Sequence, residues 1–173
     1  MTGKTRNSMA AIMTVLVTVV MWMTAAIGVI VLLAGGTELI SMLSGNAVSI
    51  GVFKVDDHAF TPPQLTASLI ALAFLVGSIV FICFQLRRIL LTLVDGDPFV
   101  AENANRLTRI AVALAVTELA RYAIKFATKA ASPETSIVLK IDLLPWASVA
   151  AIFILSQVFR EGTRLRDEEK MTI

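Results

Sequence analysis

Three charged residues, Glu118, Arg121 and Lys125, lie inside an otherwise apolar stretch of the chain. Their i, i+3, i+7 spacing places them on one face of a helix. Charge at membrane depth is costly, so such residues point into a bundle or a water-filled cavity and form relays, ligand sites or ion pairs. The trio has a net positive charge, which favours an anionic ligand or lipid. Pairing of Glu118 with Arg121 would instead make it a structural ion pair, and the spacing leaves both interpretations open.

The composition indicates the kind of fold that must position these charges. Of 173 residues, 57% are hydrophobic and only 16% are charged, whereas a soluble domain averages about 25% charge. The apolar residues fall into blocks, and each block must be helical because unpaired backbone groups in lipid are expensive. We therefore expect an all-α membrane protein, a single domain over residues 1–173 that forms a four-helix transmembrane bundle. The predicted spans are residues 9–33, 65–86, 110–128 and 143–159.

Short signals mark the ends of these helices. Gly35-Gly36 predicts the end of the first helix. Thr61 is the predicted N-cap of the second helix, with Pro62 at its first position. In the same way, Asp97-Pro98 predicts the start of a helix that continues into the third span.

The distribution of Lys and Arg predicts the orientation. Of these 15 residues, ten flank one side of the spans and three flank the other. Cytoplasmic flanks carry the excess of Lys and Arg, so both termini are expected in the cytoplasm. The chain is then a multi-pass protein of the inner, or plasma, membrane, with a cytoplasmic loop over 87–109 and a cytoplasmic tail over 160–173.

Two stretches on the opposite side alternate partly between apolar and polar residues. They are AVSIGVFKV, residues 47–55, and SIVLKIDL, residues 136–143. Alternation with β-branched residues is typical of strands, and two such strands could pair into a small extracytoplasmic β element. Irregular loops are the alternative, and the pattern leaves both open.

Several functional classes are disfavoured by what the sequence lacks. Cys83 and His58 are the only cysteine and histidine, so we expect no metal centre and no disulfide within the chain. No nucleophile with a placed base and no phosphate-binding loop is present, so we expect no catalytic residue, no cofactor and no enzyme activity. Basic residues do not form one patch, which argues against direct nucleic-acid binding.

The cytoplasmic loop and tail are the other candidate working surfaces. In the loop, DGDPFVAENANRLTR, the residues Phe99, Asn103 and Arg106 share one helical face. They form either a docking surface or an ordinary helix entry with arginine at the lipid headgroups. In the tail, VFREGTRLRDEEKMTI, an apolar ending follows a run of charge. This ending is either a frayed terminus or a segment that packs on the loop or on a partner.

The loop and tail together carry a resemblance to a known family. GDPFVAENANRL and VFREGTRLRDEEKMTI look like the two signatures of a bacterial membrane family catalogued as domain of unknown function 2975, and the likeness extends over essentially the whole chain. In this family an acidic residue more often precedes the closing Leu-Thr, so Lys170 departs from the pattern. The candidate interaction residues are Pro98, Phe99, Asn103, Arg106, Gly162, Leu165, Thr172 and Ile173.

The resemblance carries an implication about partners. Members of this family have no established activity and are often encoded beside a small helix-turn-helix transcriptional regulator. This implies a regulatory or sensory protein that sits in the lipid bilayer and binds such a regulator in the cytoplasm. The alternative is a small transporter or ion pathway that uses the charges of the third span. Four spans are few for a transporter, so that function would require a homo-oligomer.

Overall fold

The computed structural model describes residues 2–45, 61–131 and 142–171 and contains four helices in this part of the chain. They are α1 (Thr2–Ser44), α2 (Pro62–Val94), α3 (Ala101–Ala131) and α4 (Leu143–Met171). Each predicted span lies within one of these helices, and every helix is longer than its span. No strand occurs in the described ranges. The predicted β element lies outside the described residues, apart from Asp142 and Leu143 at its end.

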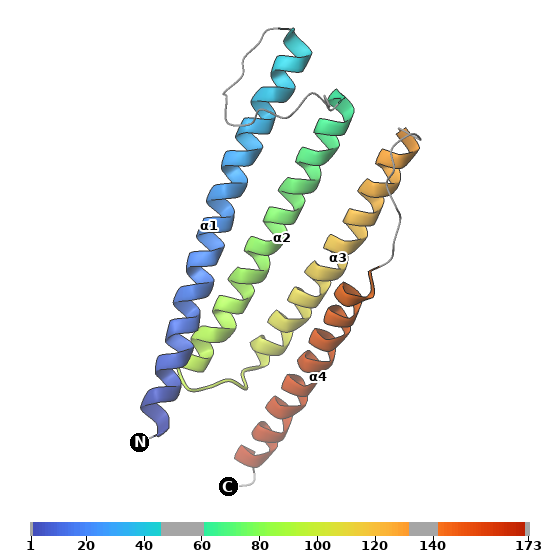
Figure 1. Ribbon diagram of the computed structural model, residues 1–173. Coiled ribbons are helices and arrows are strands. Elements are labelled where there is room, and N and C mark those ends of the chain that lie inside the picture. The colour runs from blue at the N-terminus through green and yellow to red at the C-terminus, as the bar shows by residue number, and fades with distance from the viewer. Residues whose placement is uncertain (1, 46–60, 132–141, 172–173) are drawn as a thin grey trace.

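The four helices stand side by side in chain order, as an open row rather than a closed bundle (Figure 1). Within the described ranges, α1 packs on α2, α2 on α3 and α3 on α4, while α1 and α4 do not meet. The beginning of α1 and the end of α4 lie at the same end of the row. This end, formed by residues 87–109 and 160–171, is called the terminal end below.

Three of the helices are long and apolar enough to cross a membrane. The qualifying segments are Ser8–Ser44, Pro62–Val94 and Leu143–Glu168. Large apolar side chains on them face outward, among them Trp22 at 67% exposure and Leu144 at 80%. An open row leaves such faces uncovered, which is unfavourable in water and costs little among lipid tails. The arrangement is therefore that of a membrane protein.

The first helix does not end at Gly35-Gly36, contrary to the sequence prediction. It continues to Ser44, and Gly45 then ends it with a φ of +67°. Gly35 faces Leu69 of α2 so closely that a Cβ there would overlap the leucine side chain. One heptad earlier, a Cβ on Gly28 would lie 2.6 Å from a methyl carbon of Val76. These glycines therefore serve close packing of α1 on α2 rather than termination.

The second helix begins as predicted and ends in a Schellman turn. Thr61 is its N-cap and Pro62 follows at the first helical position. At the other end, the N–H of Asp97 donates to the carbonyl of Thr92 at 3.0 Å, and Gly96 takes a φ of +85°. Glycine at this position closes the helix without strain. The predicted start of α3 at Asp97-Pro98 is wrong, because Asp97 belongs to this turn and α3 begins at Ala101.

A glycine substitution tests the α1–α2 packing. Gly28→Ala places a methyl group against the stiff, β-branched Val76, and we expect about 1–3 kcal/mol less stability from this overpacking. Gly36→Ala is the matched control, because a Cβ at Gly36 meets nothing within 4 Å. The control is expected to be neutral or stabilising by about 0.5–1 kcal/mol. Free energies of unfolding in mixed micelles give the comparison, and equal effects of the two changes would contradict it.

Candidate functional site

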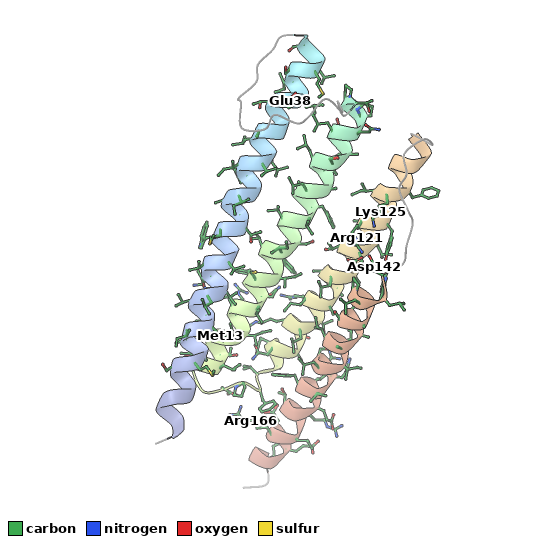
Figure 2. The ribbon with its side chains drawn as sticks, viewed as in Figure 1. Met13, Glu38, Arg121, Lys125, Asp142 and Arg166 are labelled. Carbon is green, nitrogen blue, oxygen red and sulfur yellow. The ribbon has the colours of Figure 1, made fainter. Side chains whose placement is uncertain are left out.

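Arg121 is the centre of the charged cluster on α3. Its Nη2 lies 2.7 Å from Oε2 of Glu118 and 2.9 Å from Oδ2 of Asp142. Figure 2 labels Arg121 on α3 and Asp142 just before α4. Glu118 is one turn away on α3, whereas Asp142 directly precedes α4. The Glu118–Arg121 ion pair, one of the two interpretations that the spacing left open, is therefore present, and it is extended by a second carboxylate. Arg121 thus joins α3 to the start of α4.

Tyr122 completes this connection. Its hydroxyl oxygen accepts a hydrogen bond of 2.9 Å from the backbone N–H of Asp142. The Arg121 guanidinium carbon lies 5.6 Å from the centre of the Tyr122 ring, and Nζ of Lys125 lies 6.0 Å from it. Cations over an aromatic ring are attracted by its quadrupole. The first backbone donor before α4 is satisfied, and the cations are held beside the ring.

Asp142 changes the charge of the candidate site. With it, the cluster contains two carboxylates, Glu118 and Asp142, and two cations, Arg121 and Lys125. The excess positive charge that favoured an anionic ligand is therefore absent. Sequence reasoning missed Asp142 and Tyr122. One signal in the sequence could have found Asp142, because it is an acidic residue directly before the fourth span. The third and fourth spans run antiparallel, so this end of the fourth span lies on the same side as Arg121 of the third.

A cavity of about 480 Å³ lies beside this cluster, between α2 and α3. Apolar residues of α2, including Leu72 and Leu75, form one wall, and Glu118, Arg121 and Lys125 line the other. Nε of Arg121 is buried and has no hydrogen-bond partner within the described residues. The trio is thus brought together at a cavity, although its central member, Arg121, is paired with two carboxylates, Glu118 and Asp142.

At the terminal end, Asn103 holds the α2–α3 connection. Its side chain is fully buried, and Nδ2 donates to Oγ1 of Thr92 at 2.7 Å and to the carbonyl of Pro98 at 2.9 Å. Oδ1 accepts from Arg106 Nη1 at 2.7 Å, and the same nitrogen donates to the carbonyl of Arg88 at 3.2 Å. Buried amides require such partners. Asn103 therefore fixes the loop against α2.

The tail of α4 packs on this loop. The rings of Phe99 and Phe159 have centroids 5.5 Å apart. A Cβ on Gly162 would lie 3.0 Å from Cδ1 of Phe99, so only a residue without one fits this approach comfortably. Arg166 forms an ion pair with Asp97. The first part of the tail is thus joined to the loop. The apolar ending, whose packing the sequence left open, takes no part in this contact at Met171, which is 87% exposed, and Thr172 and Ile173 lie outside the described residues.

The structure divides the predicted interaction residues into two groups. Pro98, Phe99, Asn103, Arg106 and Gly162 meet in this joint between loop and tail. Leu165 is 55% exposed and takes no part in the joint, and Thr172 and Ile173 lie outside the described residues. Beside the joint is an outward-facing cavity of about 360 Å³ between α3 and α4. Its polar lining residues are Asn105, Arg160, Thr163, Arg164 and Asp167.

Comparison with known proteins identifies one family. The family model described as Protein of unknown function (DUF2975) matches residues 55–173. The match includes α2, α3 and α4 and leaves α1 outside, so it is shorter than the whole-chain likeness expected from the sequence. No curated protein and no solved structure matches the chain.

Removal of the central cation tests the structural role of the cluster. Arg121→Ala leaves Glu118 and Asp142 without their shared partner, and we expect about 1.5–3 kcal/mol less stability. Lys125→Ala is the matched control and is expected to change stability by less than about 0.5 kcal/mol, because no salt bridge to Lys125 occurs in the described ranges. Unfolding in mixed micelles measures both. If Arg121→Ala has the same free energy of unfolding as the wild type, the result would favour a ligand site over a structural ion pair.

A second pair of variants tests the terminal joint. Asn103→Leu keeps the side-chain volume and removes the hydrogen bonds to Thr92, Pro98 and Arg106, so we expect about 1–3 kcal/mol less stability. Asn105→Leu makes the same change at an exposed position two residues away and is expected to have little effect. Thermal unfolding in detergent compares them. If both variants unfold at the wild-type temperature, Asn103 does not hold the loop.

Proposed function

The chain belongs to the family Protein of unknown function (DUF2975), and we propose that it is a membrane-embedded regulatory or sensory partner. It spans the plasma membrane four times with both termini in the cytoplasm. The terminal end binds a small helix-turn-helix transcriptional regulator. The observation that carries this proposal is the joint between loop and tail, which organises a polar surface outside the apolar part of the chain.

The placement of α3 in the membrane is supported by its neighbours. Both helices beside it, α2 and α4, are apolar enough to span. The arginine on α3 is paired with two carboxylates, and paired charges are those tolerated within a membrane. The strong excess of Lys and Arg at the terminal end supports a cytoplasmic position for that end.

The joint gives the terminal end a means to respond to the membrane. Asp97 and Phe99 contact the tail of α4, while Asn103 contacts α2. The surface cavity is lined by α3 on one side and α4 on the other. A shift of α4 relative to α3 therefore changes the surface that a regulator would contact, and coupling of this kind requires only different contacts in two states.

A transporter or ion pathway is the second candidate. The cavity beside Glu118, Arg121 and Lys125 favours it, because charged residues at a cavity mark substrate or ion paths in membranes. The pairing of Arg121 with two carboxylates weighs against it, since neither carboxylate is left to exchange ions alone. Proteoliposomes that show no more flux than empty vesicles would remove this candidate.

Capture of the regulator tests the proposed function. The full chain, reconstituted in nanodiscs, is expected to retain a purified small helix-turn-helix regulator, taken from the neighbouring gene where one is encoded there. Arg160→Glu reverses a charge at the surface cavity and is expected to weaken retention at least about tenfold. Asp95→Asn alters an exposed charge at the same end that does not line this cavity and serves as the control. Absence of binding in both detergent and lipid would overturn the proposal.

A further inference from the structure

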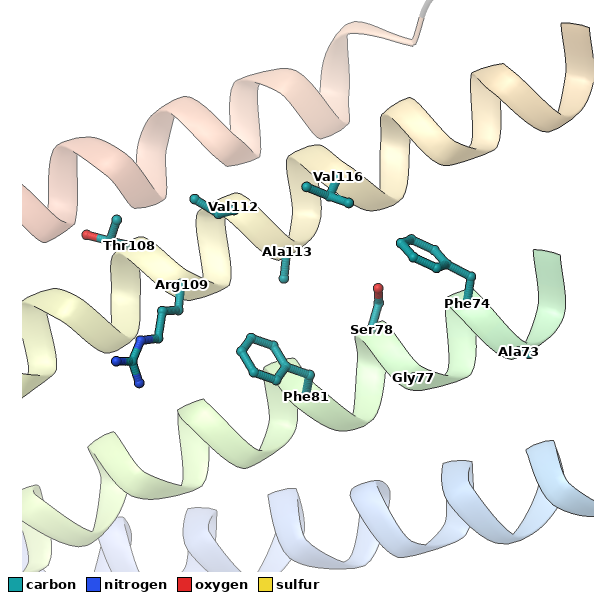
Figure 3. Close-up of a pocket in the computed structure, with 10 residues that line it drawn as sticks. All are labelled: Ala73, Phe74, Gly77, Ser78, Phe81, Thr108, Arg109, Val112, Ala113 and Val116. Carbon is teal, nitrogen blue, oxygen red and sulfur yellow. The ribbon is translucent and has the colours of Figure 1, made fainter. Parts of the chain in front are cut away.

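An open apolar groove of about 530 Å³ runs between α2 and α3 (Figure 3). Phe74 and Phe81 extend into it from α2, and Val112 and Val116 line it from α3. Gly77 forms part of its floor, where a Cβ would meet nothing within 4 Å. None of Glu118, Arg121 and Lys125 lines this groove. The groove begins nearer the terminal end than the cavity beside Arg121 does.

Arg109 lies at the terminal end of this groove (Figure 3). Its side chain is exposed, and within the described residues it takes part in no hydrogen bond or ion pair. Two other arginines at this end are occupied: Arg106 donates to the Asn103 side chain, and Arg88 lies 4.5 Å over the Phe84 ring. A guanidinium at the mouth of an apolar groove is complementary to a ligand with an anionic head and an apolar tail.

We infer that this groove binds an anionic phospholipid of the cytoplasmic leaflet. One acyl chain lies against Phe74, Phe81, Val112 and Val116, and Arg109 binds the phosphate. The inference rests on the membrane placement and orientation proposed above. It goes beyond that function, because it assigns a ligand to a surface that the regulator does not contact.

The dimensions and position of the groove fit a lipid. From Arg109 to Val116 it follows α3 for about 10 Å at 1.5 Å per residue. One leaflet contributes about half of a hydrocarbon core of about 30 Å, so the groove occupies most of one leaflet. Its volume is within the range of about 300–1,000 Å³ that is typical of small-molecule sites. Arginine beside the apolar boundary attracts anionic headgroups.

Lipid retention measured by native mass spectrometry tests the inference. The full chain is reconstituted with equal amounts of phosphatidylglycerol and phosphatidylcholine and then released from nanodiscs. The wild-type chain is expected to retain phosphatidylglycerol in preference to phosphatidylcholine. Arg109→Gln is expected to lower that preference about tenfold or more, because it loses a charged contact to phosphate. Gly77→Leu fills the groove and is expected to remove retention of both lipids.

Matched variants separate these effects from general damage. Gly36→Leu makes the same change at a glycine on α1 that also has open space for a Cβ. Arg164→Gln removes an equal charge beyond the groove, on the tail of α4. Both are expected to retain phosphatidylglycerol as wild type does. Circular dichroism checks that every variant stays helical, and Arg109→Gln decides the question even if Gly77→Leu unfolds.

Three results would overturn the inference. They are absence of lipid on the wild-type chain, equal preference in Arg109→Gln and wild type, and equal retention in folded Gly77→Leu and Gly36→Leu. Carbonate washing of membranes distinguishes failure of the lipid inference from failure of the proposed function. A chain that stays in washed membranes without a retained lipid contradicts only the groove, whereas a chain released by carbonate contradicts the membrane placement itself.

Discussion

The place of α3 in the row depends on the ion pairs that Arg121 makes with Glu118 and Asp142. By length and composition, three of the described helices are apolar enough to span a membrane, and α3 is not among them. It lies between α2 and α4, which both are. An unpaired arginine in the middle of a membrane helix costs roughly 2.5–3.5 kcal/mol even by the smaller estimates. In the four-span topology proposed above, two carboxylates within hydrogen-bond distance would offset this cost. Because Asp142 directly precedes α4, the same contact also fixes where α4 begins along α3.

A second connection between α3 and α4 lies at the terminal end. There the tail of α4 reaches the loop before α3 through Phe99, Gly162 and the Asp97–Arg166 ion pair. The α3–α4 pair is thus held at both ends by side chains distant in sequence. The α1–α2 pair is held differently, by close backbone approach at Gly28 and Gly35. The open row is in effect two helical hairpins, each joined by its own kind of contact.

The sequence predicted what local rules determine and missed what distant partners determine. All four helices, the Thr61–Pro62 start and the Glu118–Arg121 pair follow from periodicity and spacing along one helix. The predicted helix end at Gly35-Gly36 was wrong, because the absence of a side chain at Gly35 makes room for Leu69 of α2. The Asp97 cap failed because Asp97 closes the turn that ends α2 and its side chain pairs with Arg166, 69 residues away. The open row was missed because apolar blocks indicate burial but do not distinguish a neighbouring helix from lipid.

The two hairpins meet at the α2–α3 interface, where Ile89 of α2 and Leu107 and Ile110 of α3 form a buried apolar cluster. Hydrogen bonds cross it at two levels, from Thr117 to Ser78 at 2.6 Å and from Asn103 to Thr92 at 2.7 Å. Between and around them lies the apolar groove, and Ser78 lines it. A molecule in this groove touches both hairpins and would favour the spacing that fits it best. Asn103 bonds across this interface to Thr92 and also to the carbonyl of Pro98, the residue before Phe99, which packs on the tail of α4. A change in spacing at this interface is therefore close to the contact between loop and tail.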